Sequence, residues 1–147
     1  MKAVYATGTN YDDPLSVLEV GTMPEPETKP FWSTIRVNSA SVNHHDVWSL
    51  QGVGLSDEQT PMILGTDAAG VLEEDIPVRK GLKAGSEVVL YTFVGTDGAG
   101  VMPGERRSIL SERYAGTMAE YTQVPSANVF AKPANLNLDE AAEIGRA

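Results

Sequence analysis

The chain has 147 residues, with 20 acidic side chains, 11 basic side chains and no cysteine. The length suits one domain with one hydrophobic core, and the lack of cysteine excludes disulfide bonds, thiolate metal ligands and a cysteine nucleophile. Residues 1–75 hold 12 acids and 3 bases, whereas residues 76–147 hold 8 of each. We expect the acids to form a solvated face and no nucleic acid to bind, because phosphate binding needs clustered lysine and arginine.

The N-terminal segment holds one lysine and no long apolar run, so no signal peptide is predicted. No run of 18 apolar residues occurs anywhere, and no membrane contact is expected. The lack of cysteine fits a reducing compartment, and a cytoplasmic protein is therefore expected.

Short extended segments, broken by proline, glycine, asparagine and aspartate, dominate the first 43 residues. Residues 2–7 are apolar and are predicted to form a strand. Residues 15–20 alternate between apolar and polar side chains, as a half-buried strand does. Three prolines within residues 24–30 mark a loop, and residues 31–43 follow as a long extended segment.

The first helix is predicted over residues 44–51, and Gly52 is a suitable residue to end it. Residues 62–72 form a second β-rich segment, with unusually small side chains in its middle. Residues 86–91 read as a buried strand. Residues 95–117 are glycine-rich and are predicted to be a loop.

Two more strands are predicted over residues 118–124 and 129–132, and a second helix over residues 138–144. Asn137 could cap that helix, because Glu140 follows three residues later. The apolar residues of this helix need a partner surface, and none follows in the sequence: Leu138, Ala141, Ala142 and Ile144. Many short strands with two short helices predict a mainly β fold, either a barrel or a sandwich.

The glycine-rich stretch at residues 95–100 does not have the spacing of a dinucleotide-binding fingerprint. That fingerprint needs G-x-G-x-x-G between a strand and a helix, so that the helix N-terminus faces the pyrophosphate. Pro103 follows here instead, and residues 65–70 fail the same test. We expect a surface loop at residues 95–100.

His44 and His45 are the only histidines, and successive helical residues point about 100° apart, so both could hardly bind one ion. A zinc site would need Asp46 or Asp67 together with one histidine. His45 is expected to be a hydrogen-bonded structural residue. Asp46, in the first helical turn, is expected to cap the helix or join an internal ion pair. Trp48 is expected in the core or in a pocket wall.

The segment that begins Asn43-His44-His45-Asp46 and the segment at residues 63–71 (ILGTDAAGV) resemble the medium-chain dehydrogenase/reductase superfamily. The closest subgroup is the zinc-independent quinone oxidoreductase-like enzymes. Three further segments match in order and spacing, although serine stands at position 86 where aspartate is usual: residues 81–89, 116–125 and 132–142.

The resemblance implies a GroES-like fold, a partly open β-barrel. Residues 1–135 would form an incomplete GroES-like catalytic domain, and residues 136–147 would start the helix that leads to a Rossmann domain. We expect the chain to be truncated before that domain, which would hold the main binding site for the cofactor.

Zinc-dependent members of the superfamily have cysteine at the position of Asn43 and histidine at that of Thr66, so no zinc is expected. In zinc-free members, the resemblance places Asn43 and Thr66 beside the cofactor, expected to be NADPH. His44 and Trp48 would line the substrate pocket, together with Thr66. Asn43 and His44 would be the catalytic residues, with His44 protonating or hydrogen-bonding the substrate carbonyl oxygen.

The resemblance therefore implies the N-terminal catalytic domain of an NAD(P)H-dependent oxidoreductase that reduces quinones, enones or related carbonyl compounds by hydride transfer. The chain alone is expected to be inactive, because the binding energy of the adenine and phosphates is missing. One alternative is a GroES-like interaction module without catalysis, whose apolar edge is covered by a partner or in a homodimer. A zinc-type alcohol dehydrogenase is the other alternative, and it would require stoichiometric zinc.

Overall fold

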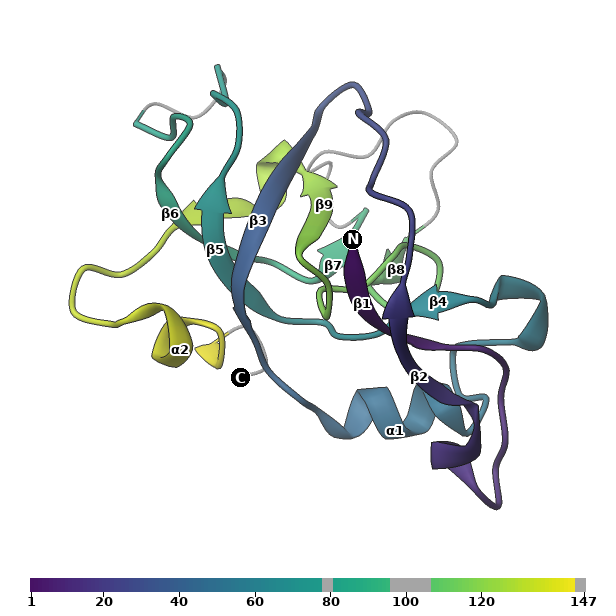
Figure 1. Cartoon of the computed structure of the whole chain (residues 1–147). Helices are drawn as coiled ribbons and strands as arrows, with labels where there is room; N and C mark the ends of the chain where they lie inside the picture. Colours follow the sequence, from purple (N-terminus) through teal and green to yellow (C-terminus); the bar gives the residue numbers. More distant parts are fainter. Residues whose placement is uncertain (78–80, 96–106, 145–147) are drawn as a thin grey trace.

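The computed structural model describes residues 1–77, 81–95 and 107–144 of the chain. These residues form a mainly β fold whose sheets curl around a common interior, with two short α-helices at the lower end of the view in Figure 1. The predicted mainly β fold with short helices and a partly open barrel is confirmed.

A five-stranded antiparallel sheet, in the order β10-β6-β5-β3-β9, is the largest unit of the fold. Its strands are β3 (Trp32–Ala40), β5 (Ala68–Leu72), β6 (Glu87–Leu90), β9 (Tyr121–Pro125) and β10 (Val129–Ala131). A three-stranded sheet, in the order β2-β1-β4, lies beside it. Its strands are β1 (Lys2–Ala6), β2 (Leu18–Thr22) and β4 (Met62–Ile63).

The remaining described elements are short. Strands β7 (Phe93–Val94) and β8 (Ser108–Ile109) pair with each other. The helices are α1 (His44–Leu50) and α2 (Leu138–Ala141), with the 3₁₀ turns η1 (Pro14–Val17), η2 (Asp57–Gln59) and η3 (Ser126–Asn128). None of the described helices is long and apolar enough to cross a membrane.

The main core draws on all five strands of the larger sheet, because every second residue of a strand points to the same face. Six of its side chains have no exposed surface: Ile35, Val88, Val94, Leu110, Val124 and Val129. Burial of each aliphatic side chain of this size stabilises the fold by about 2 kcal/mol. The core therefore fixes the sheet from which α1 emerges.

A second cluster of buried apolar residues holds α1 in place. Leu50, the last residue of α1, packs with Ala6 of β1 and with Met62 and Leu64 around β4. The start of α1 is fixed by its direct continuation from β3. Both ends of the helix are thus anchored to sheet residues.

Strand β1 is joined to a segment that lies far along the chain. Val4 N–H donates to Met118 O at 2.8 Å, and Glu120 N–H donates to Lys2 O at 3.1 Å. Lys2 N–H also donates to the Glu120 carboxylate at 2.7 Å. These bonds connect the small sheet to the residues that precede β9.

The small residues predicted within residues 62–72 have a packing reason. A Cβ atom at Gly70 would collide with the backbone carbonyl oxygen of Arg36 on β3. The strands approach closely there because the β3–β5 register shifts between Val37 and Ser39. The predicted single β-rich segment is in fact two strands, β4 and β5, separated by a turn.

The strand predicted over residues 15–20 is wrong in its first half. Residues Pro14–Val17 form η1, and β2 begins only at Leu18. Proline at the first position favours a helical turn, because its fixed φ is helical and its missing N–H is not needed there. The alternating pattern did not reveal this turn.

The loop predicted over residues 95–117 is also partly wrong. Ser108–Ile109 forms β8, which was too short to show a sequence pattern. The glycine-rich residues 96–100 lie outside the described part of the chain.

Helix α2 confirms its predicted cap and corrects the expectation that it has no partner surface. Asn137 Oδ1 accepts from Glu140 N–H at 2.9 Å, and Glu140 Oε2 accepts from Asn137 N–H at 2.9 Å. Ala141 and Ala142 are buried against Ala69 of β5. The sheet of this same chain is therefore the partner of α2.

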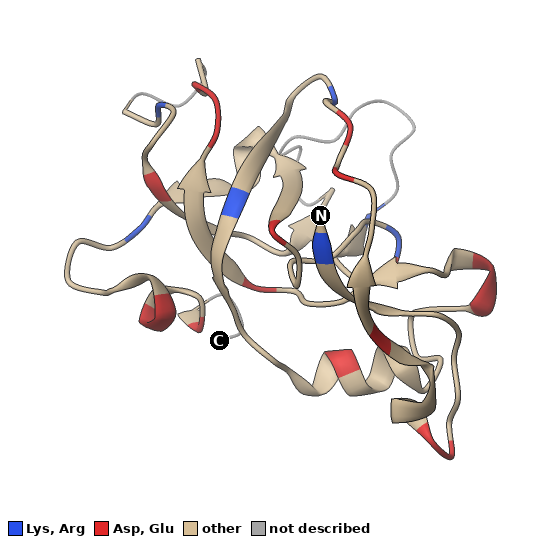
Figure 2. Cartoon of the chain, viewed as in Figure 1, with Lys and Arg blue, Asp and Glu red and all other residues tan. Residues whose placement is uncertain are grey.

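The acidic side chains are spread over loops, strands and both helices (Figure 2). The expected solvated acidic face has two exceptions, Asp46 and Asp67, which are buried. Both lie around the start of α1.

Candidate functional site

Asp46 ties the start of α1 to the turn between β4 and β5. Its Oδ2 accepts from Asn43 N–H at 2.8 Å, and its Oδ1 accepts from Gly65 N–H at 2.9 Å. The predicted capping role is confirmed. Burial raises the pKa of Asp46, and this effect outweighs the two backbone N–H donors, which lower it.

A polar cluster, made of the buried residues Ser41, Thr66 and Asp67 and the half-buried Asn43, lies at the junction of β3, α1 and the turn before β5. Asn43 Nδ2 donates to Asp67 Oδ2 at 2.6 Å and to Thr66 Oγ1 at 3.2 Å. Thr66 Oγ1 in turn donates to Asp67 Oδ2 at 3.1 Å. The structure thus brings together Asn43 and Thr66, two of the residues predicted to form the site.

Asp67 is the centre of this polar cluster. Its role as the acceptor for Asn43 and Thr66 was missed by sequence reasoning. The residue is only 1% exposed, and its Oδ1 has no hydrogen-bond partner among the described groups. Since a carboxylate only accepts hydrogen bonds, Asp67 fixes which atom of the Asn43 amide faces it. The motif GTDAAG placed Asp67 next to Thr66, but nothing in it showed that the carboxylate points inward.

The donor set of the polar cluster consists of an amide, two hydroxyls and one carboxylate. Zinc in proteins is held mainly by cysteine thiolates and histidine nitrogens. Among the described residues, no group of three histidine, aspartate or glutamate side chains could hold a metal ion. The chemistry of these donors therefore does not fit a zinc centre.

His44 and Trp48 lie on the outer face of α1, away from the core. Their rings are 6.1 Å apart between centroids, as expected for residues one turn apart. Trp48 is 52% exposed, so it is not a core residue. These two predicted site residues face solvent, whereas Asn43 and Thr66 are at the inner side of the helix start.

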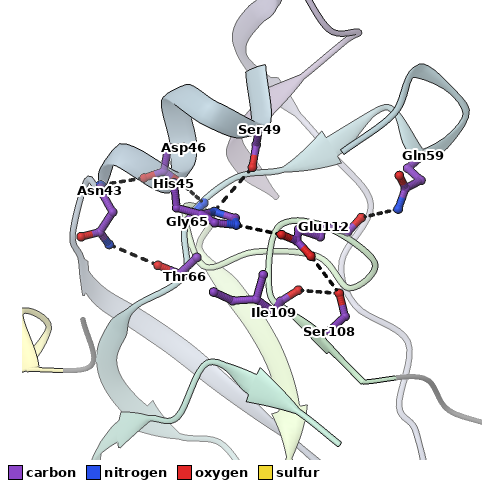
Figure 3. A network of polar contacts seen from close by, with 10 residues as sticks. All are labelled: Asn43, His45, Asp46, Ser49, Gln59, Gly65, Thr66, Ser108, Ile109 and Glu112. Carbon is purple, nitrogen blue, oxygen red and sulfur yellow. Dashed lines mark hydrogen bonds and ion pairs between the residues drawn. The ribbon is translucent and has the colours of Figure 1, made fainter. Parts of the chain in front are cut away.

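His45 points toward Glu112 from the inner side of α1 (Figure 3). Its Nε2 lies 3.2 Å from Glu112 Oε1, and its Nδ1 lies 3.5 Å from Ser49 Oγ. The predicted role of His45 as a hydrogen-bonded residue is confirmed. Sequence reasoning missed Glu112, because 67 residues separate it from His45 and no local pattern links them.

A pocket of about 440 Å³ adjoins this pair. Its walls are formed by His45, Phe93, Val94, Arg107, Ser108, Ile109 and Glu112. Most of this surface is apolar, and the polar groups are few. Ligand pockets in proteins commonly have this composition.

A curled, mainly β domain with two short helices is consistent with the GroES-like domain of alcohol dehydrogenases. The model of the alcohol dehydrogenase GroES-like domain matches residues 29–134, and the chain belongs to this family. The predicted membership of the medium-chain dehydrogenase/reductase superfamily is thereby confirmed. No curated protein matches the sequence.

Solved structures are also similar to this chain, and they include alcohol dehydrogenases. An NAD-dependent alcohol dehydrogenase is 37% identical, with a TM-score of 0.79 over 97% of this chain and 42% of that chain. A thermostable alcohol dehydrogenase from Pyrobaculum aerophilum, with cobalt and zinc bound, is 28% identical, with a TM-score of 0.75 over 99% of this chain and 44% of that one. The quinone oxidoreductase from Coxiella burnetii is 22% identical and shares the fold, with a TM-score of 0.71 over 97% of this chain and 40% of that chain. The chain spans less than half the length of each.

Proposed function

We propose that this chain is the catalytic domain of a nicotinamide-dependent oxidoreductase that reduces quinones, enones or related carbonyl compounds by hydride transfer. The observation that carries the proposal is the Asn43–Thr66–Asp67 arrangement within a GroES-like domain. The similar structures described as an alcohol dehydrogenase and a quinone oxidoreductase support the class of reaction.

Asn43 and Thr66 are the proposed contacts to the cofactor, and NADPH is the proposed form. The reduced nicotinamide, when bound, supplies the hydride. Asn43 is suited to this contact because hydrogen bonds to Asp67 and Thr66 hold its side chain in one place. One similar structure is described as NAD-dependent, so binding of NADPH and of NADH should be measured side by side.

His44 is the proposed hydrogen-bond donor to the substrate oxygen, and Trp48 the proposed apolar wall beside it. Both side chains are accessible on the outer face of α1, and their rings lie close together. A substrate that binds there would be oriented by one polar and one aromatic group.

The proposed reaction needs no zinc. Its support is the donor chemistry of the polar cluster, where Asn43 and Thr66 bind Asp67 instead of presenting soft ligands. Metal analysis of the purified protein is expected to show no stoichiometric zinc. One zinc per chain, removed by a chelator together with activity, would favour the zinc-type alternative.

We further propose residues 1–135 as the catalytic domain and residues 136–147 as the start of the connection to a cofactor domain. The sequence of this chain holds no dinucleotide fingerprint. The 147 residues alone are therefore expected to bind NADPH weakly and to be inactive. Fluorescence titration with NADPH tests this, and micromolar binding to the isolated chain would contradict it. A cytoplasmic location, favoured by the lack of cysteine, stays a prediction.

Turnover is tested with the protein expressed from its complete reading frame. NADPH oxidation is followed in the presence of a p-benzoquinone, an enone or an aldehyde. Asn43→Ala is expected to abolish most of the turnover. Asn137→Ala removes the matching asparagine of α2, which bonds Glu140 and no member of the polar cluster; it is the control and should retain the turnover. Absence of turnover with all three substrates would contradict the proposed function.

A protein-interaction module is the second candidate, because β2 is an edge strand and Val20 on it is 79% exposed. Such edges pair readily with another chain. Light scattering distinguishes the candidates: a stable dimer of a protein without turnover would favour the module, and a strict monomer would argue against it.

A further inference from the structure

A second cavity, of about 320 Å³, lies on the side of the fold where β3 begins and β9 ends. Its walls come from the segment before β3, from residues 113–115 and from β9. None of the residues of the proposed site lines it: Asn43, His44, Trp48 and Thr66. The cavity is therefore distinct from the place of the proposed reaction.

Two aromatic rings form the inner wall of this cavity. Trp32 is 7% exposed and belongs to the main core, and the half-buried Tyr114 packs against that core. The ring centroids are 5.3 Å apart, and the ring planes are inclined by 48°. Because the core fixes both rings, the cavity offers a rigid aromatic surface to a bound molecule.

Two cationic side chains stand beside these rings. Lys29 Nζ lies 4.4 Å from the centroid of the Trp32 ring and 5.8 Å from that of the Tyr114 ring. Arg113 is exposed and lines the same cavity, and no ion pair joins it to another described residue. Glu27 is the only acid among the described residues of the lining, so bases exceed acids there.

This excess of positive charge differs from the composition of the chain as a whole. The net charge is −9, and residues 1–75 hold only three bases: Lys2, Lys29 and Arg36. Most of the surface therefore repels an anion, and a local group of cations attracts one. The cavity beside Lys29 is such a place.

Two turns with unfavourable backbone conformations present the lining side chains. Phe31 has φ of +64° and Ser111 has φ of +72°, and they are the only non-glycine residues with positive φ in the described part of the chain. In the first turn Trp32 N–H donates to Lys29 O at 3.2 Å, and in the second Ser111 N–H donates to Tyr114 O at 2.8 Å. Positive φ is uncommon for such residues, and these conformations cluster at functional sites. Both turns of this kind flank the same cavity.

We propose that this cavity binds a small aromatic carboxylate. The carboxylate pairs with Lys29 and Arg113, and the ring lies against Trp32 and Tyr114. A guanidinium group can hold a carboxylate through two parallel hydrogen bonds, and the cavity has the size of a small-molecule site. The proposal does not rest on the proposed function, because the two share no residue.

The same walls disfavour other classes of ligand. Lys29 already covers the ring face that a cationic ligand would use. An inorganic anion would leave the aromatic surface without a contact, and an uncharged ring would leave the two cations without a partner. A molecule with both a ring and a negative group uses the whole lining.

The two tryptophans of the chain allow a direct test, because Trp32 lines the cavity and Trp48 lies on the outer face of α1. ¹⁵N NMR of the indole N–H groups gives one signal for each, and Trp48→Phe assigns them. Benzoate should shift the Trp32 signal in a saturable way and leave the Trp48 signal in place. No saturable shift of the Trp32 signal below about 10 mM benzoate would overturn the proposal, as would a shift confined to Trp48.

Two further probes separate the charge of the ligand from its ring. Benzamide has the ring without the charge and should bind about tenfold more weakly than benzoate, because it forms no ion pair. Inorganic phosphate has the charge without the ring and should not shift the Trp32 signal in a saturable way. Benzamide that binds as tightly as benzoate, or phosphate that displaces benzoate at equal concentration, would overturn the proposal.

Variants of the two cations test the contacts themselves. Lys29→Gln and Arg113→Gln should each weaken benzoate binding about tenfold and leave benzamide binding unchanged. Both side chains are exposed, so the fold should persist. If Lys29→Gln nevertheless fails to fold, Arg113→Gln carries the test. Benzoate binding at the wild-type level in Arg113→Gln would overturn the proposal.

Arg36→Gln is the matched control for these variants. Arg36 is an exposed cation on the same strand as Trp32, but it pairs with Glu73 and does not line the cavity. This variant changes the net charge by the same amount and should bind benzoate like the wild type. A loss as large as that in Arg113→Gln would mean that net charge, and not the cavity, governs binding, and the proposal would be wrong.

Discussion

Helices α1 and α2 both begin with a capping box led by an asparagine, yet the two asparagines have different tasks. Asn137 bonds Glu140 within its own helix start and stabilises α2 locally. Asn43 also reaches across the fold, where its side-chain nitrogen donates to Asp67 and Thr66. The same local motif is structural in one helix and part of a candidate site in the other.

The surroundings of the two helices explain this difference. Around α2, small side chains of the sheet cover one face, and the helix start stays exposed. Around α1, the turn between β4 and β5 brings a buried carboxylate to the helix start. A buried carboxylate needs hydrogen-bond donors, so the asparagine nearest to it takes on a second role.

The largest effect is expected at the carboxylate that distinguishes the two regions. Asp67→Ala leaves the Asn43 amide and the Thr66 hydroxyl without their buried acceptor. We expect a loss of about 3 kcal/mol in the free energy of unfolding, since each unpaired buried group costs on the order of 1–3 kcal/mol. Urea unfolding measures it. A loss under about 1 kcal/mol would mean that the polar cluster does not need Asp67.

The paired variants Asn43→Ala and Asn137→Ala compare the two helix starts directly. Asn137→Ala removes a helix cap and should cost about 1 kcal/mol. Asn43→Ala keeps the backbone oxygen that accepts from Asp46 N–H but leaves the buried Asp67 carboxylate without its shortest hydrogen bond, so about 2 kcal/mol is expected. Both are measured by urea unfolding under the same conditions. Equal losses would show that the second role of Asn43 adds no stability.

Asp46 makes the start of α1 sensitive to pH. Because burial raises its pKa, the folded chain holds the Asp46 proton more tightly than the unfolded chain does. The stability that this proton contributes is complete at low pH and is lost as the pH rises through the raised pKa.

Asp46→Asn removes that titration and weakens the bonds to Asn43 and Gly65. We expect the wild type to be more stable by about 1–2 kcal/mol near pH 4, with a smaller difference at pH 7. Urea unfolding of both proteins across this range is the measurement. A difference that grows with pH would contradict the direction of the shift.

The smallest effect is expected at the exposed start of α2. Asp139 accepts from Ser39 Oγ and lies in the first turn, where its charge favours the helix. Asp139→Ala should cost about 0.5 kcal/mol, because exposed charge interactions are weak. Thermal unfolding at low and high salt checks this, and a loss above about 1.5 kcal/mol would show that α2 is more than a surface helix.

Local sequence was sufficient for many parts of the fold. The cap of α2, the end of α1 near Gly52 and the strand at residues 86–91 follow from side chains that are close in sequence. The family resemblance also led to Asn43 and Thr66, which the structure joins by a hydrogen bond. These features depend on residues within one element or one motif.

Features that depend on contacts across the fold could not be predicted from residues that are close in sequence. Glu112 meets His45 only because the segment after β8 folds back against α1. The inward direction of Asp67 depends on the turn between β4 and β5, and the partner of α2 is a sheet formed much earlier in the chain. In each case the contact partner is determined by tertiary packing, and no local sequence pattern predicts it.

Strand β1 has a consequence for synthesis of the protein. Its bonds to Met118 and Glu120 can form only after those residues have left the ribosome. At about 5–20 residues per second, the first strand waits roughly 6 to 23 s for them. During that time β1 has only β2, and later β4, to pair with. A chaperone that binds nascent apolar segments would have its longest opportunity at this strand.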